Sequence, residues 1–154
     1  MPKLDLDTIP QTDATGYPAP YDAAVAGRWY RRLAPPGGLT AMGVSHVTLK
    51  PGAWSSQRHW HMAEDEFVVV LGEAVLVDDA GEQVMRAGDC AAFPAGERNG
   101  HHLQNRSDAD CVFIAVSAGD RARDRGEYPD IDMTFGPDGY ARKDGAPYPT
   151  RRLP

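Results

Sequence analysis

The chain of 154 residues has little of three features that would each define a class of protein: cysteine, long apolar runs and an excess of positive charge. Its two cysteines, Cys90 and Cys111, are too few for a disulfide framework, and their apolar neighbours predict two buried thiols. No apolar run approaches the roughly 20 residues that a membrane-spanning helix needs. The formal net charge of −6 disfavours attraction to nucleic acid.

Basic residues gather only in two short segments, 28–32 (RWYRR) and 120–127 (DRARDRGE), which we interpret as solvated surface or as subunit contacts. The first residues, MPKLDLDTIPQTD, lack the basic and apolar regions of a signal peptide, so we expect a cytoplasmic protein. An apolar content of 42% and a charged content of 25% are typical of globular proteins, and the length fits one domain.

The composition changes twice along the chain. Residues 1–42 begin proline-rich and predict an arm that packs on the body or on a partner subunit, with one helical turn beginning at Asp22. Residues 43–117 alternate apolar segments with short turns rich in Gly, Asp, Asn and Pro, which predicts an all-β barrel or sandwich. The strands expected there are 44–49, 58–61, 66–71, 74–77, 83–86, 90–93, 101–105 and 111–116. Residues 118–154 predict a second arm, with a hairpin of 131–135 and 140–143.

Candidate chemistry is concentrated in the segment 51–67, PGAWSSQRHWHMAEDEF. Side chains alternate along a strand, so His59 and His61 point to one side and Trp60 points to the other. Glu66 begins the next apolar strand, and His101 heads a later one. If the strands roll into a small barrel, three imidazoles and one carboxylate can converge in its mouth.

This set of donors predicts a metal site formed by His59, His61, Glu66 and His101. Imidazole-rich sites with one carboxylate suit Mn(II), Fe(II), Ni(II), Co(II) or Zn(II) better than calcium or magnesium. Four protein ligands on an ion that prefers six leave two positions for water or substrate, as a catalytic metal requires. The remaining histidines, His46 and His102, are read as structural or exposed, and an inward-facing His46 would be a partner to the ligands.

The spacing of these residues resembles the two motifs of the cupin family, Gx5HxHx3-4Ex6G and Gx5PxGx2Hx3N. The first is matched by Gly52, His59, His61, Glu66 and Gly72. The second is matched by Gly88, Pro94, Gly96, His101 and Asn105.

Three intervals depart from the pattern, each at or near a turn, where a change of length costs little. His59 follows Gly52 one residue late, Gly72 follows Glu66 one residue early, and His101 follows Gly96 two residues late. A slip of one residue within the strand after Glu66 would reverse its faces. We therefore take Glu66 as the inward carboxylate and its neighbours Glu64 and Asp65 as solvated, with Asp65 the ligand in the other register.

The resemblance implies a double-stranded β-helix of the cupin type, a small jelly roll with extended N- and C-terminal arms that form a homodimer. It also implies a divalent metal acting as Lewis acid on a small molecule, such as a sugar derivative or a carboxylate metabolite. Isomerase, decarboxylase and dioxygenase chemistry all remain open, because the fold does not select among them. The alternative is a non-catalytic cupin that binds or senses a small ligand. No nucleic acid or membrane partner is expected.

Overall fold

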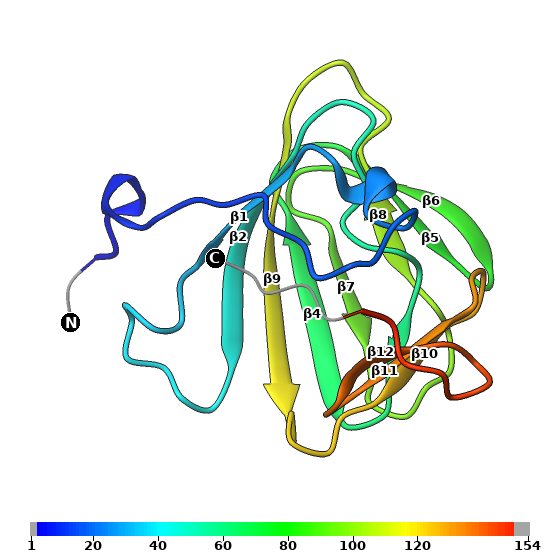
Figure 1. Ribbon diagram of the computed structural model, residues 1–154. Helices are drawn as coiled ribbons and strands as arrows, with labels where there is room; N and C mark the ends of the chain where they lie inside the picture. Colours follow the sequence, from blue (N-terminus) through cyan, green and yellow to red (C-terminus); the bar gives the residue numbers. More distant parts are fainter. Residues whose placement is uncertain (1–2, 150–154) are drawn as a thin grey trace.

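The computed structural model describes residues 3–149, and nearly all of its regular structure is antiparallel β-sheet (Figure 1). The strands are β1 (Arg28–Arg32), β2 (Gly43–Leu49), β3 (Trp60–His61), β4 (Glu64–Val70), β5 (Ala74–Asp78), β6 (Gly81–Met85), β7 (Cys90–Phe93), β8 (His102–Gln104), β9 (Cys111–Gly119), β10 (Gly126–Tyr128), β11 (Met133–Gly136) and β12 (Gly139–Ala141). Two short 3-10 helices, η1 (Leu6–Thr8) and η2 (Ala23–Val25), precede them. The prediction of an all-β fold is confirmed, and no helix of the described residues is long and apolar enough to cross a membrane.

The strands form three sheets. A five-stranded sheet has the order β1-β2-β9-β4-β7, a four-stranded sheet the order β12-β11-β10-β3, and a three-stranded sheet the order β6-β5-β8. Figure 1 shows the large sheet on one side of the molecule and the β10–β12 strands, in orange and red, beside the lower end of β4 and β7. Strands from outside residues 43–117 therefore extend the sheets of that region: β1 is added to the large sheet, and β10–β12 are added to β3.

The eight strands expected between 43 and 117 are all present, although 58–61 is shortened to β3. The helical turn after Asp22 appears as η2, and the terminal hairpin appears as β11 and β12. Two strands were not expected, β1 and β10. Both have charged and aromatic residues in place of an apolar alternation. β1 pairs with the next strand, β2, whereas β10 pairs with its neighbour β11 and with β3, which is far away in sequence.

The inner face of the large sheet is set by the register of its strands. Leu49 lies opposite Cys111, Val70 lies opposite Phe113, and all four are nearly or fully inaccessible to solvent. Since side chains alternate, Glu66 lies on the same inner face as Val70, four residues before it. The register that turns Glu66 inward is therefore the one adopted.

A second apolar cluster covers the open end of this face. It consists of Tyr17, Val25, Tyr128 and Met133, from the N-terminal segment, η2, β10 and β11. Tyr17 packs edge-on against Tyr128 with ring centroids 5.7 Å apart, and stacks on Tyr140 at 5.5 Å. A cavity of about 440 Å³ lies between this cluster and the sheet.

Two expectations about single residues were wrong. Cys111 is buried as predicted, but Cys90 is exposed, because it begins β7, an edge strand of the large sheet, directly after the turn that ends at Asp89. Glu64 was expected to be solvated, yet it is 8% exposed and accepts a hydrogen bond from Arg121 Nε at 2.9 Å. Its even spacing from Glu66 puts both carboxylates on one side of β4.

Candidate metal centre

His59 and His61 are presented from a short extended segment that ends in β3. The backbone of His59 pairs with that of His101 through two hydrogen bonds, of 3.2 and 2.9 Å, while β3 pairs with β10. Trp60 points the opposite way, as the alternation predicts, and its buried ring packs under the guanidinium of Arg98 at 5.3 Å. The backbone pairing thus brings His101 beside His59 although 42 positions separate them in the sequence.

The carboxylate comes from the other wall. Glu66 lies in β4 between β7 and β9, in register with Phe93 and Ser117. Asp65, its neighbour, points away and accepts a hydrogen bond from the Ala95 amide at 2.8 Å. Asp65 is therefore occupied elsewhere and Glu66 is the carboxylate within the cavity.

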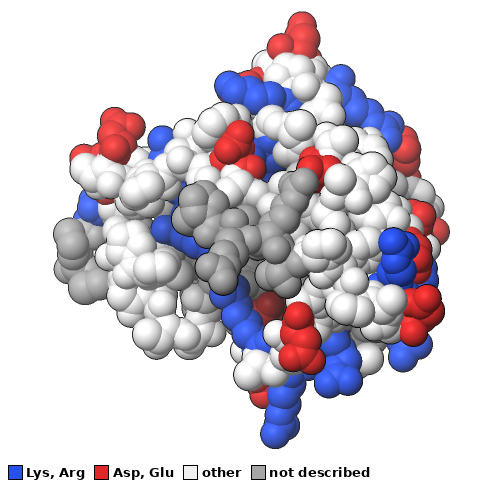
Figure 2. Space-filling model, in the orientation of Figure 1, with Lys and Arg blue, Asp and Glu red and all other residues white. Residues whose placement is uncertain are grey.

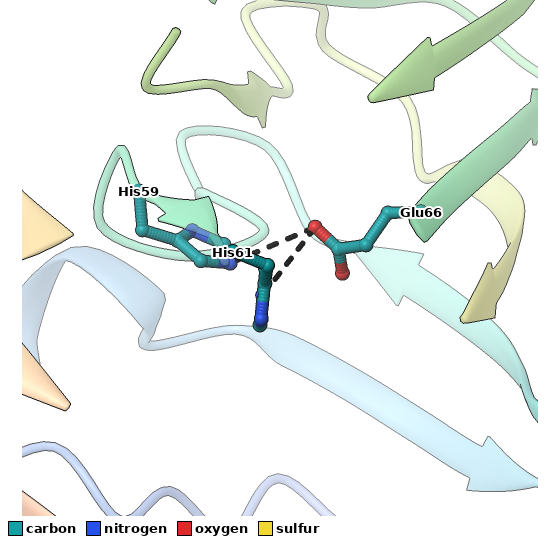
Figure 3. A group of neighbouring side chains, drawn as sticks. All are labelled: His59, His61 and Glu66. Atoms are coloured by element: carbon teal, nitrogen blue, oxygen red, sulfur yellow. Dashed lines mark ion pairs between the residues drawn. The ribbon is translucent and has the colours of Figure 1, made fainter. Parts of the chain in front are cut away.

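The three imidazoles converge on one atom. The Nε2 atoms of His59, His61 and His101 lie 3.8, 3.6 and 3.0 Å from Glu66 Oε2. Figure 3 shows His59 and His61 approaching this oxygen from the side opposite the stem of Glu66. An ion about 2.1 Å from each ligand would separate neighbouring ligand atoms by roughly 3.0–3.4 Å, so these spacings fit a metal centre with small adjustments.

The other ring nitrogen of each histidine faces an acceptor. His59 Nδ1 is 2.9 Å from Gln57 O, His61 Nδ1 is 2.5 Å from Asp124 Oδ2, and His101 Nδ1 is 3.2 Å from Asn99 O. Each of these acceptors can hold the ring proton on Nδ1, so that the Nε2 lone pair is available to a metal ion. Without an ion, His101 Nε2 is 3.0 Å from Glu66 Oε2, within hydrogen-bonding distance, and a metal ion would take the place of the proton between these two atoms. The residues present therefore fit a divalent metal.

Burial sets the protonation of the cluster. Desolvation lowers the pKa of His59 to about 4, against the attraction of Glu66. Desolvation alone would raise the pKa of Glu66, but the hydrogen bond from His101 and the nearby histidines outweigh it and lower that pKa to about 2. At neutral pH His59 is a neutral imidazole and Glu66 a carboxylate, which are the forms that bind metals.

Aromatic rings hold the imidazoles in place. Phe93 stacks on His101 with centroids 3.5 Å apart and planes 2° from parallel, and Tyr128 stacks on His59 at 5.5 Å. Phe135 meets His61 edge-on at 4.9 Å. Tyr128 and Phe135 come from β10 and β11, in the region that the sequence predicted to be an arm. Their aromatic character was visible in the sequence, but no local pattern joined them to the histidines.

Asp124 is the functional residue that sequence reasoning missed. It lies in the segment 120–127, interpreted as solvated surface or a subunit contact, yet it is only 6% exposed. Its Oδ1 accepts from the Ala63 amide at 2.9 Å and its Oδ2 from His61. The signal was an acid four residues before the aromatic Tyr128, and its two basic neighbours, Arg123 and Arg125, masked it.

The two remaining histidines stay outside the cluster. His102 is buried and its Nδ1 bonds to Ser56 O at 2.9 Å, which agrees with a structural role. His46 pairs across the sheet with Arg31 and Ile114, on the face opposite Val47, so it is no partner to the ligands.

Comparison with known proteins places this architecture in a family. Residues 45–117 match the model of the cupin domain. A protein from Silicibacter pomeroyi DSS-3, described as a sugar phosphate isomerase from a cupin superfamily, is 48% identical over 96% of this chain and 97% of that chain, with a TM-score of 0.88. The chain belongs to the cupin superfamily.

More distant structures share the fold alone. A candidate sugar phosphate isomerase from Acidithiobacillus ferrooxidans ATCC 23270 is 24% identical over 82% of this chain and 81% of that chain, with a TM-score of 0.69. A protein from Thermotoga maritima named as a predicted oxalate decarboxylase is 24% identical over 60% of this chain and 80% of that chain, with a TM-score of 0.53. No protein with a curated description matches the chain.

Proposed function

We propose that this cupin is a metal-dependent isomerase of a small, oxygen-rich substrate of the sugar phosphate class, and that His59, His61, Glu66 and His101 hold its metal. The observation that carries the proposal is the convergence of three Nε2 atoms on Glu66 Oε2 at the wall of a cavity large enough for a small molecule. The name of the 48% identical relative supports the choice of an isomerase among the chemistries open to the fold.

A divalent ion at this cluster would act as a Lewis acid and polarise the oxygens of a carbonyl and its neighbouring hydroxyl. The chain supplies the surroundings. Glu66 balances part of the positive charge, and the Nδ1 contacts keep each imidazole turned toward the centre. Phe93, Tyr128 and Phe135 pack against the imidazoles and exclude water from one side of them.

Three tyrosines add polar groups to the wall of the cavity. Tyr17, Tyr128 and Tyr140 line the cavity, and burial raises the pKa of each of them. They therefore remain neutral phenols at physiological pH and can donate hydrogen bonds to substrate hydroxyls, but they are poor bases. Substrate orientation is the role that their chemistry allows.

The test is metal reconstitution followed by a substrate screen. Purified protein would be analysed for bound metal, stripped with a chelator, and reloaded separately with Mn(II), Fe(II), Co(II), Ni(II) or Zn(II). Each form would be assayed for aldose–ketose interconversion of pentose and hexose phosphates, and for oxygen consumption. We expect isomerisation that depends on the metal and is lost in His101→Ala, whereas the control His46→Ala, on the outer face of the sheet, retains it.

Other results would lead elsewhere. Oxygen consumption without isomerisation would replace the isomerase with a dioxygenase. Tight binding of a sugar phosphate without turnover by any metal form would favour the ligand-binding or sensing cupin. The cytoplasmic homodimer expected from the sequence belongs to the same proposal, and light scattering of the purified protein tests the dimer.

A further inference from the structure

Strand β1 turns two arginines into the cavity. Arg28, Tyr30 and Arg32 alternate along β1 and all three line the cavity, while Trp29 and Arg31 belong to the other face. Arg28 lies opposite Leu49, a core residue of the inner face. The segment 28–32, interpreted from the sequence as solvated surface or a subunit contact, therefore contributes cationic side chains to the wall of the candidate site.

The charge around the cavity differs from that of the molecule. The chain has a net charge of −6, and acidic and basic side chains are interspersed on the face drawn in Figure 2. Among the described residues that line the cavity, however, Arg28 and Arg32 face a single acid, Glu66. A divalent ion held by Glu66 would make the excess of positive charge larger, and a positive cavity favours an anionic ligand.

The guanidinium of Arg28 is poorly paired for its position. Nη1 donates to Ser55 O at 2.8 Å, while Nε is buried and has no hydrogen-bond partner in the part of the chain that the structure describes. Other shielded cations have acidic partners: Arg58, for example, forms ion pairs with Asp79 and Asp130. No ion pair among residues 3–149 includes Arg28. A buried donor on a charged group costs free energy until an acceptor reaches it.

Nearby polar groups do not neutralise this charge. Arg28 is close enough to Tyr17 and Tyr140 for its charge to act on both hydroxyls. Burial nevertheless holds the pKa of Tyr17 well above its usual range, so its phenol stays uncharged. Tyr30, between the two arginines, offers only the face of its ring, with the Arg28 and Arg32 guanidinium carbons 5.6 and 5.8 Å from its centroid.

We infer that Arg28 binds the phosphate group of a phosphate monoester substrate while the histidine and glutamate cluster faces the oxygens to be rearranged. A guanidinium is a planar fork that matches phosphate oxygens. Two cations against one carboxylate favour a dianion over a monocarboxylate. Arg32, exposed at the end of β1, adds long-range attraction at the rim. The identity of the remaining part of the substrate rests on the proposed function, but the anion site does not.

The experiment measures binding instead of turnover. Metal-loaded protein would be titrated calorimetrically with inorganic phosphate, a hexose 6-phosphate, the same hexose without phosphate, and the corresponding uronate. We expect the hexose phosphate to bind more tightly than the hexose or the uronate. Arg28→Met should weaken its binding by about ten- to a hundredfold, the usual effect of losing hydrogen bonds to a charged group. The metal content should not change.

The controls separate this site from the metal and from the fold. Arg31→Met makes the same change on the opposite face of β1 and should leave binding unaltered. If Arg28→Met misfolds, Arg28→Lys, which keeps the charge but not the fork, should still weaken binding severalfold. Equal affinities of wild type and the folded Arg28 variant, or of hexose and hexose phosphate, would overturn the inference. Phosphate binding through Arg28 without isomerisation would instead overturn the proposed reaction alone.

Discussion

Replacement of Asp124 by asparagine should weaken metal binding even though Asp124 is not a ligand. Both oxygens of Asp124 accept hydrogen bonds, one from the Ala63 amide and one from His61 Nδ1, at 2.9 and 2.5 Å. Asparagine has one carbonyl oxygen and one amino group, so it can satisfy only one of these two donors. If its amino group faces His61, the ring proton must move to Nε2, which then cannot coordinate. If the amino group faces the Ala63 amide instead, two hydrogen-bond donors point at each other and neither has an acceptor.

The magnitude follows from the burial of this pair. With Asp124 only 6% exposed, water cannot replace the lost contact, and a buried donor left without an acceptor costs about 1–3 kcal/mol. Such a cost would weaken metal binding by roughly 5- to 150-fold. This range includes the roughly 10- to 100-fold loss that is typical when a ligand histidine loses its hydrogen-bond partner. Competition with a chromophoric chelator measures the metal affinity, and Asp120→Asn, an exposed acid nearby, is the control. An affinity of Asp124→Asn within twofold of wild type would refute the reasoning.

Three further predictions concern the ligands themselves. His59→Ala and His101→Ala should abolish stoichiometric metal in elemental analysis while the circular dichroism stays β-rich; full retention in both variants would exclude the proposed ligand set. Glu66→Gln should lower metal affinity more than Asp65→Asn, because only Glu66 faces the imidazoles, and the reverse order would contradict the strand register. In metal-free protein, His59 binds a proton below about pH 6.5 in the unfolded chain but only below about pH 4 in the folded chain. Protonation therefore favours the unfolded state, and the free energy of unfolding should fall by up to about 3 kcal/mol as the pH is lowered from 6.5 to about 4. Denaturant titrations of wild type and His59→Gln check this, and equal pH slopes in the two would contradict it.

The strands that bear the candidate ligands could be predicted because their information is local. The run after Glu66 is apolar and bounded by turns, and the two histidines at 59 and 61 alternate with a buried tryptophan. Period-two alternation and turn residues act over a few positions, so a single sequence contains them. The prediction that Glu66, and not Asp65, points into the barrel required only that the strand keep its phase through to Val70.

The walls of the cavity could not be predicted because their information is not local. Arg28, Asp124, Tyr128 and Phe135 lie outside the motif-bearing region, in segments with the composition of exposed loops. Arg28 and Tyr128 reach the site through strand pairing, β1 with β2 and β10 with the much earlier β3, and Phe135 follows on β11, which pairs with β10. The local sequence around an arginine does not indicate whether its side chain will face solvent or a cavity. Only the register across the sheet decides that.

This difference between ligands and walls bears on how the site acquires its chemistry. The histidines and Glu66 would hold a metal in any barrel that places them so, and such a centre can serve several reactions. In the proposed function, the shape and charge of the remaining cavity would restrict the reaction, and the terminal segments contribute to both through Tyr17, Arg28 and the β10–β12 strands. Substrate choice should therefore respond to changes in residues such as Arg28 that leave the metal untouched. Metal occupancy should respond to Asp124, which is not among the residues that line the cavity, so the two properties should be separable in one chain.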